Sequence, residues 1–186
     1  MSMIRQCTLG LGAALLLAGS AQAAEEQVPI HQVSSEGLGQ KIGVVMLEDT
    51  EQGLLLTPEL EELPPGSHGF HVHQNASCEP AMKDGEKTAA AAAGSHLDPE
   101  NTGTHQGPNG EGHLGDLPAL AVDDQGKATT PVLAPRLEVA DLENHALIIH
   151  EGGDNYSDNP ALGGGGARIA CGTIGLNPDA TPATGT

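Results

Sequence analysis

Residues 68–73 read His68-Gly69-Phe70-His71-Val72-His73, and this stretch indicates both the fold and the chemistry of the chain. Alternate side chains of a β-strand point to opposite faces, so the imidazoles of His71 and His73 project together while Val72 faces the other way. The apolar neighbours Phe70 and Val72 place this strand in the wall of a hydrophobic core. The stretch therefore predicts two histidines held side by side at the edge of that core.

Four more histidines and one aspartate follow, each beside glycine, proline or a short apolar run. They are His96, His105, His113, Asp116 and His150, and with His71 and His73 they include six of the nine histidines in the chain. Imidazole and carboxylate groups are ligands of zinc and copper. Seven such residues exceed one tetrahedral site and suit two adjacent metals that share a ligand. Each histidine alone is more simply a solvated loop residue, but the whole set favours a pair of metals.

Short strand-like runs separated by turn signals predict an all-β barrel or sandwich. The composition agrees, because 26 Gly and 13 Pro accompany one Phe, one Tyr and no Trp. We find neither an internal repeat nor a second domain. Two segments, 76–112 and 151–167, do not read as strands, and loops of this length inside a compact domain are usually functional. The expected strands are 28–33, 41–48, 53–57, 69–74, 115–122, 128–133, 145–150 and 168–175.

Residues 1–23 have the layout of a secretory signal peptide. Arg5 precedes an apolar run at 9–18, which is shorter than the roughly 20 residues that span a bilayer, and small residues at 21–23 offer a cleavage site. We expect cleavage after Ala23, a single domain over residues 24–176 and a disordered tail over 177–186. The protein is then periplasmic and has no membrane segment once the signal is removed.

Cleavage changes the charge and the cysteine count. Loss of Arg5 leaves six basic residues against 25 acidic ones, a net charge of about −19. Such a charge argues against nucleic acid and anionic membranes as partners. Cys7 also leaves, so Cys78 and Cys171 remain as an even pair in an exported protein, for which a disulfide is expected.

Two further residues are candidates for supporting roles. Asp154 lies four residues after His150 and could accept the second N–H of that histidine, although a loop-capping aspartate is the simpler alternative. Arg168 follows four glycines, which permit close packing of the backbone, and precedes Cys171 by three residues. A cation beside metals in so acidic a chain suggests an anion guide, whereas Arg168 viewed alone is an ordinary surface arginine.

In their order along the chain, these motifs resemble the copper/zinc superoxide dismutases of bacterial periplasms. The resemblance covers about residues 28–176 and implies an eight-stranded, sandwich-like Greek-key β-barrel whose two long loops form the metal site. The stretches that carry it are 68–73 (HGFHVH), 94–99 (GSHLDP), 112–118 (GHLGDLP), 149–155 (IHEGGDN) and 163–172 (GGGGARIACG).

The resemblance also implies a role for each candidate residue. It gives one copper to His71, His73, His96 and His150, and one zinc to His96, His105, His113 and Asp116, so that His96 is shared. It makes Asp154 the link between a copper histidine and a zinc histidine, Cys78 and Cys171 the disulfide, Arg168 the anion-binding residue and His68 a structural histidine. No role follows for His31 or His145.

The activity implied is the conversion of superoxide to dioxygen and hydrogen peroxide by alternate reduction and reoxidation of copper. His96, held by zinc, is the expected proton donor, and Arg168 is the second expected catalytic residue. One alternative is a non-catalytic periplasmic protein that binds copper and zinc. Another is a zinc hydrolase, which the complete zinc set disfavours because it leaves no open position. Since aromatic residues are scarce, a monomer and a homodimer both stay open.

Overall fold

Eleven strands and three 3-10 turns carry the regular secondary structure of residues 25–175, which are the residues that the computed structural model describes. The predicted signal peptide and the predicted disordered tail lie outside them. None of the helical turns in this range has the length and hydropathy that a membrane crossing requires. The strands are β1 (Glu25–Ser34), β2 (Gly37–Thr50), β3 (Gly53–Leu60), β4 (Gly66–His68), β5 (Phe70–His73), β6 (Ala81–Lys83), β7 (Glu86–Thr88), β8 (Leu120–Val122), β9 (Val132–Ala134), β10 (Ala146–His150) and β11 (Arg168–Thr173), and the 3-10 turns are η1 (Ala91–Ala93), η2 (Val139–Leu142) and η3 (Ala161–Gly164).

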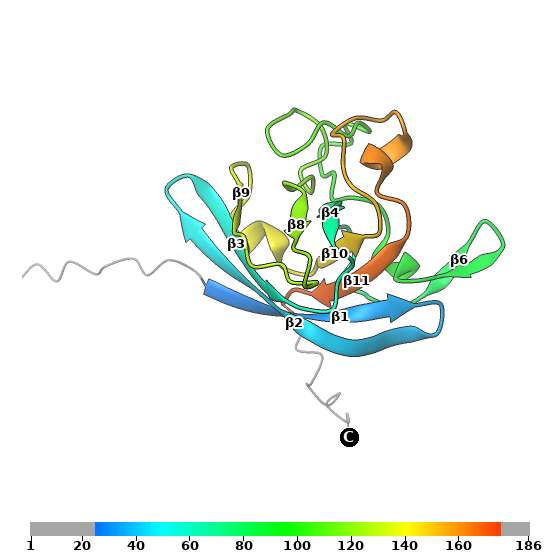
Figure 1. Cartoon of the computed structure of the whole chain (residues 1–186). Helices are drawn as coiled ribbons and strands as arrows, with labels where there is room; N and C mark the ends of the chain where they lie inside the picture. Colours follow the sequence, from blue (N-terminus) through cyan, green and yellow to red (C-terminus); the bar gives the residue numbers. More distant parts are fainter. Residues whose placement is uncertain (1–24, 176–186) are drawn as a thin grey trace, which may run out of the picture.

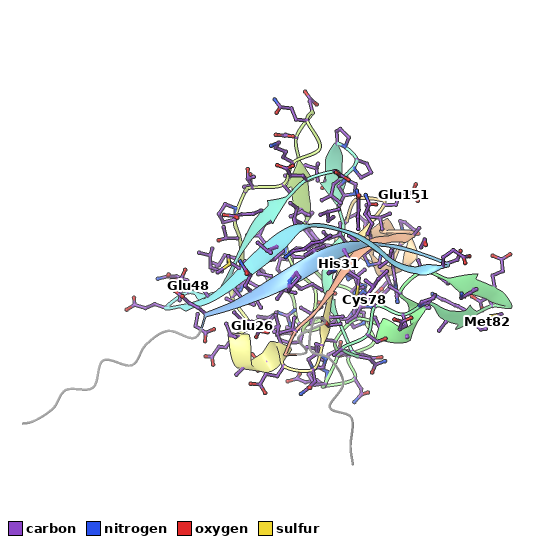
Figure 2. All side chains as sticks on the ribbon, turned by 90° about the horizontal axis from the view of Figure 1, so that it is seen from below. Glu26, His31, Glu48, Cys78, Met82 and Glu151 are labelled. Atoms are coloured by element: carbon purple, nitrogen blue, oxygen red, sulfur yellow. A yellow bond between two sulfur atoms is a disulfide. The ribbon has the colours of Figure 1, made fainter. Side chains whose placement is uncertain are left out.

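Seven strands form one curved antiparallel sheet in the order β5-β10-β11-β1-β2-β3-β9 (Figure 1). The chain runs through β1, β2 and β3 as neighbours and later crosses from β9 at one edge to β10 beside the other, a connection of the Greek-key kind. The pair β4–β8 lies over the concave side of the sheet, and β6–β7 is a hairpin that projects from the body of the domain (Figures 1 and 2). The all-β prediction is confirmed.

Aliphatic side chains fill the concave side of the sheet. Along β3, burial alternates from residue to residue, and the side chains of Leu54, Leu56 and Leu60 have no exposed surface. They pack in one cluster with Phe70 of β5 and with Leu120 of β8. Each fully buried side chain of this size stabilises the fold by roughly 1.5–3 kcal/mol, so the core keeps the wall that carries β5 and β10 in place.

The predicted strand at 115–122 is wrong in its first half, because regular pairing is confined to β8. Gly115 and Asp116 instead turn toward β5, and Pro118 has no N–H to donate to a ladder. The strand predicted at 128–133 lies too early in the sequence, because β9 covers Val132–Ala134. Strands β4, β6 and β7 were not predicted. The second long segment holds only the turn η3, as expected, but the first holds the β6–β7 hairpin besides η1, so the prediction that it contains no strand is wrong there.

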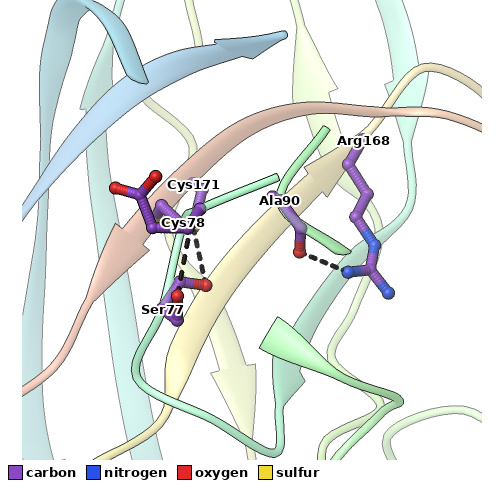
Figure 3. The surroundings of a disulfide bond; sticks show 6 residues. Ser77, Cys78, Ala90, Arg168 and Cys171 are labelled. Atoms are coloured by element: carbon purple, nitrogen blue, oxygen red, sulfur yellow. Dashed lines mark hydrogen bonds between the residues drawn. A yellow bond between two sulfur atoms is a disulfide. The ribbon is translucent and has the colours of Figure 1, made fainter. Parts of the chain in front are cut away.

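The expected disulfide joins Cys78 to Cys171 across a sequence separation of 93 residues, with 5.8 Å between the two Cα atoms. Cys171 lies on β11 and is fully buried, while Cys78 begins the first long segment and is 5% exposed. The bond therefore ties the start of that loop to the sheet (Figure 3).

Candidate metal centre

β5 holds His71 and His73 against β10. Its register places His71 opposite Ile148 and His73 opposite Ala146, and both imidazoles are buried. Val72 points into the apolar core. The two imidazole ring centroids are 6.4 Å apart, so the prediction of paired histidines on one side of a strand is confirmed.

The first long loop returns along the free edge of β5 and brings two more candidates with it. Isolated bridges pair His73 with His96 and His71 with Asp116. The N–H of Val72 donates to the carbonyl of Gly115 at 2.9 Å, which keeps this edge in contact with the loop. A Cβ on Gly115 would lie 2.3 Å from the carbonyl oxygen of Val72, so only glycine permits this approach.

His150 enters the same cluster from the end of β10, where the register with β11 shifts after Ile149. Its Nε2 lies 3.4 Å from Nε2 of His73, and its Nδ1 donates to the carbonyl of Gly166 at 3.2 Å. His68 is buried with one ring nitrogen 2.7 Å from the carbonyl oxygen of His150 and the other 2.7 Å from that of Pro64. His68 therefore fixes the backbone of His150, in agreement with a structural role.

The candidate residues form two buried groups that meet at His96. Within each group, one potential ligand atom per residue lies within 4.8 Å of the others. Asp116 accepts a hydrogen bond from Nδ1 of His96 at 3.0 Å, and the ring centroids of His96 and His71 are 4.0 Å apart. The first group is His71, His73, His96 and His150, and the second is His96, His105, His113 and Asp116.

Unpartnered nitrogens show that these groups fit metal ions. Among the described side chains, the buried nitrogens with no hydrogen bond of good geometry are His71 Nδ1, His96 Nε2, His105 Nδ1 and His113 Nδ1, and the last two lie 2.9 Å and 3.4 Å from Asp116 Oδ1. A buried polar atom without a partner is costly, and a lone pair directed at a cation removes that cost. Imidazole and carboxylate are the donors that zinc accepts, and imidazole also suits copper. Both groups thus present ligand atoms.

In His71, His73 and His105, the second ring nitrogen is held by the protein, which fixes the orientation of each ring. Nε2 of His71 donates to Asp154 Oδ2 at 2.7 Å, and Nε2 of His105 donates to Asp154 Oδ1 at 2.8 Å. Nδ1 of His73 donates to the carbonyl of Gly94 at 3.0 Å. Asp154 therefore links one histidine of each group, and the suggestion from sequence spacing that it bonds to His150 is wrong.

Burial keeps the histidines of the first group uncharged in the metal-free protein. It lowers the pKa of His71, lowers that of His73 well below the usual value, and lowers that of His96 to about 4. Burial likewise lowers the pKa of His150 to about 3. Neutral imidazoles at pH 7 offer lone pairs, and binding of a cation to this group needs no proton to leave.

The carboxylates of Asp116 and Asp154 set the charge of His105 in the second group. Burial alone would lower the pKa of His105, but contacts with Asp116 and Asp154 outweigh it and raise the value to about 9. Burial would raise the pKa of the Asp116 and Asp154 carboxyl groups. Contacts with His105 and His96 nevertheless hold the pKa of Asp116 far below the usual range, and hydrogen bonds from His105 and His71 do the same for Asp154. A cation bound at Nδ1 of His105 therefore replaces a proton.

Arg168 stands beside the first group and is partly buried. Its guanidinium donates to the carbonyl of Ala90 at 2.5 Å (Figure 3) and to that of Gly94 at 2.6 Å. Both carbonyls belong to the loop that the disulfide anchors. Arg168 lines a pocket of about 320 Å³ together with Lys83 and Leu162, so two cations face this opening. Arg168 is paired with His150 in the register of β10 and β11, and its predicted role stays a prediction.

Three residues with contacts at the site were not predicted. Arg136 donates to backbone carbonyls of the loop that holds His113, Tyr156 accepts from the N–H of Ala119 at 2.9 Å, and Asp158 accepts from the N–H of His105 at 3.0 Å. Arg136 is one of three arginines and Tyr156 is the only tyrosine of the chain, and this rarity is a signal that could have drawn attention to both.

Comparison with known proteins gives consistent matches. The family described as copper/zinc superoxide dismutase matches residues 41–174. A curated relative from Salmonella typhimurium named superoxide dismutase [Cu-Zn] 2 is 58% identical over 86% of this chain and 94% of its own, and the superoxide dismutase [Cu-Zn] of Escherichia coli is 57% identical over 87% and 94%.

Solved structures agree with these matches. The Cu/Zn superoxide dismutase from Brucella abortus superposes with a TM-score of 0.80 at 47% identity, covering 81% of this chain and 99% of its own. A solution structure described as the monomeric copper, zinc superoxide dismutase from Salmonella enterica superposes with a TM-score of 0.74 at 58% identity and the same coverage.

Proposed function

The chain belongs to the copper/zinc superoxide dismutase family, and we propose that its two buried groups are the copper and zinc sites of that enzyme. The protein is an oxidoreductase that acts on superoxide and uses copper and zinc. The alternative of a non-catalytic metal-binding protein finds no support, because the curated relatives carry the name of the enzyme.

The proposed assignment gives each metal four ligands. Copper is held by His71, His73, His96 and His150, and zinc by His96, His105, His113 and Asp116. The observation that carries the assignment is the pattern of ring nitrogens at His96: Nδ1 faces Asp116, whereas Nε2 is buried and unpartnered beside His71. One ring thus offers a nitrogen to each group.

Bound copper supplies the one-electron oxidation of one superoxide to dioxygen and the one-electron reduction of a second. The protein supplies position, charge and protons. Nε2 of His96 can carry a proton when it is not a copper ligand, and it then delivers that proton to the reduced product, which leaves as hydrogen peroxide after a second proton arrives from solvent. Asp116 accepts from Nδ1 of His96 at 3.0 Å, and a zinc ion held by His105, His113 and Asp116 would bind that nitrogen instead, so the ring stays in place while Nε2 gains and loses that proton.

Arg168 is the proposed guide for the anionic substrate. The two carbonyls that its guanidinium donates to keep the cation fixed beside the first group. Exposed charges are screened over about 8 Å at physiological salt, so the many surface carboxylates oppose an approaching anion less than their number suggests. The nearby cation then dominates the local field.

Selective loss of one metal tests the ligand assignment. We expect His73→Ala to weaken copper binding and leave zinc bound, and His113→Ala to do the reverse, since each removes a ligand that belongs to one group. Metal content of the purified variants after dialysis against a weak chelator measures this. Equal loss of both metals in both variants, with the fold retained by circular dichroism, would overturn the assignment.

Neutralising Arg168 tests the guide. Arg168→Ala is expected to lower kcat/KM for superoxide by roughly tenfold or more at low ionic strength and to flatten its dependence on salt. Lys127→Gln is the matched control, because Lys127 is an exposed cation paired with Glu61 at 2.8 Å. Superoxide decay measured over a range of salt concentrations gives both quantities. A variant with the salt dependence of the unaltered enzyme would contradict the role.

We further propose that the protein is exported to the periplasm. The leader layout of residues 1–23 supports this, and a disulfide suits an oxidising compartment. The N-terminal mass of the protein recovered from a periplasmic extract tests the proposed cleavage after Ala23; an intact Met1 in that extract would refute it.

A further inference from the structure

Arg136 connects the wall of the barrel to the loop that holds two of the zinc-group residues. Its guanidinium donates four hydrogen bonds, all to backbone carbonyls of a short loop segment. The donor and acceptor pairs are Nε to Pro108 at 3.1 Å, Nη1 to Gly112 at 3.1 Å, and Nη2 to Gly107 at 3.4 Å and to His113 at 2.6 Å. The last of these acceptors is the carbonyl of a proposed zinc ligand.

The base of Arg136 is fixed in the barrel. It follows β9 and lies between Ala134 and Leu137, each only 2% exposed. The N–H of Leu137 donates to the carbonyl of Ala134 at 3.3 Å, and the N–H of Val139 donates to Asp49 Oδ1 at 2.7 Å. The chain on both sides of Arg136 is therefore anchored, and the guanidinium extends from a fixed point.

The segment that Arg136 reaches has little support of its own. Residues 103–115 contain no strand or helix, and Gly107 adopts a φ of 71°. Among the internal contacts that cross it, the N–H of His113 donates to the carbonyl of Thr104 at 2.9 Å, and Asp116 accepts from the N–H of Gly107 at 3.3 Å. Apart from the N–H of Val72 on β5, which donates to the carbonyl of Gly115 at 2.9 Å, the other hydrogen bonds of this segment run to residues on loops.

We propose that Arg136 is a positioning residue that holds the zinc group in its metal-binding arrangement before zinc arrives. The inference rests on the proposed function, because it takes His105, His113 and Asp116 as zinc ligands. A preorganised group spends less free energy on ordering the loop when the metal binds. Residues that orient metal ligands typically contribute 10–100-fold to metal affinity, and Arg136 is expected to act in that range.

The geometry requires arginine. A guanidinium is a planar fork whose five N–H groups can reach several carbonyls at once, whereas a lysine ammonium donates from a single nitrogen. The carbonyls of Pro108 and Gly112 are reached from different nitrogens of Arg136. Arg136→Lys keeps the charge and loses the fork, so it is expected to bind zinc nearly as weakly as Arg136→Gln.

Tyr156 lies on the second long segment, and its ring packs against the loop that Arg136 holds. It is the only tyrosine, the chain has no tryptophan, and its hydroxyl accepts from the N–H of Ala119. A Cβ on Gly107 would lie 2.8 Å from the Tyr156 ring, so the ring lies directly on the segment that Arg136 holds. Tyrosine emission of the metal-free protein therefore reports the arrangement of this loop.

The experiment compares zinc affinity, copper affinity and tyrosine emission in metal-free protein. The variants are Arg136→Gln and Arg136→Lys, with Lys127→Gln as the matched control for loss of a cation and His113→Ala as the reference for loss of a ligand. Zinc affinity is measured by competition with a chelating dye. Visible absorption of cobalt(II) bound in place of zinc reports the geometry of the group.

We expect both Arg136 variants to bind zinc 10–100-fold more weakly, with altered cobalt bands and altered tyrosine emission, while copper affinity and the Lys127→Gln protein stay unchanged. Unchanged zinc affinity in Arg136→Gln, or full zinc affinity in Arg136→Lys, would overturn the inference. So would an equal loss of both metals, which indicates general unfolding. Should His113→Ala also bind zinc as tightly as the unaltered protein, the proposed ligand assignment itself fails.

Discussion

Replacing His96 with alanine is expected to lower kcat/KM for superoxide by about 10²–10⁴-fold, the usual contribution of a positioned proton donor. The same change is expected to weaken the binding of both metals, because His96 is the residue common to the two groups. Its Nδ1 lies 3.0 Å from Asp116 Oδ1, and its ring centroid is 5.3 Å from that of His113. Its Nε2 has no hydrogen-bond partner among residues 25–175.

A matched control separates this effect from general damage. His31→Ala removes a partly exposed histidine of β1 that has no assigned role, so its activity and metal content are expected to stay unchanged. Superoxide decay and metal analysis at saturating copper and zinc measure both variants. If His96→Ala keeps activity within a few-fold of the unaltered enzyme while it holds copper, the proton at Nε2 does not serve catalysis.

Removal of the disulfide is expected to lower the free energy of unfolding by roughly 4–5 kcal/mol, because the bond closes a loop of nearly a hundred residues. The test is the double replacement Cys78→Ser with Cys171→Ser. Denaturant unfolding of the metal-free forms gives the quantity without the contribution of metal binding, which would otherwise raise the apparent stability.

The same double variant tests how the loop carries Arg168. The carbonyl of Ala90 accepts from Arg168, and Ala90 lies on the segment that Cys78 anchors (Figure 3). We therefore expect a lower rate as well as a lower stability at a temperature where the variant is folded. A loss of stability below about 1 kcal/mol would show that the loop is held by other contacts, chiefly the buried side chains of Ala90 and Ala93.

Local periodicity was enough to predict the strand that carries the paired histidines and the all-β fold. The alternation of His71, Val72 and His73 is a property of a few neighbouring residues, and the apolar core selects which face is buried. The lack of a strand-like pattern also identified most of the two long segments as loops, apart from the β6–β7 hairpin. The gathering of His96, His105 and His113 beside that strand required the resemblance to a known family, because spacing along a loop does not determine its path.

Other features depended on long-range contacts. The predicted strand at 115–122 fails because Gly115 is drawn against the carbonyl of Val72, forty-odd residues earlier. Asp154 follows His150 in sequence yet bonds to His71 and His105. By contrast, Asp84-Gly85 between β6 and β7 is a hairpin turn signal that was overlooked; both residues have positive φ, as a type I′ turn requires.

The central claim is that the two ring nitrogens of His96 coordinate the two metals at the same time. Electron paramagnetic resonance tests this claim most directly. Protein loaded with copper(II) and zinc should give the signal of an isolated copper ion. Replacing zinc by cobalt(II) places a second set of unpaired electrons on the other nitrogen of the same ring, so the copper signal should be lost or strongly broadened. A copper signal that is identical with zinc and with cobalt would contradict the shared histidine.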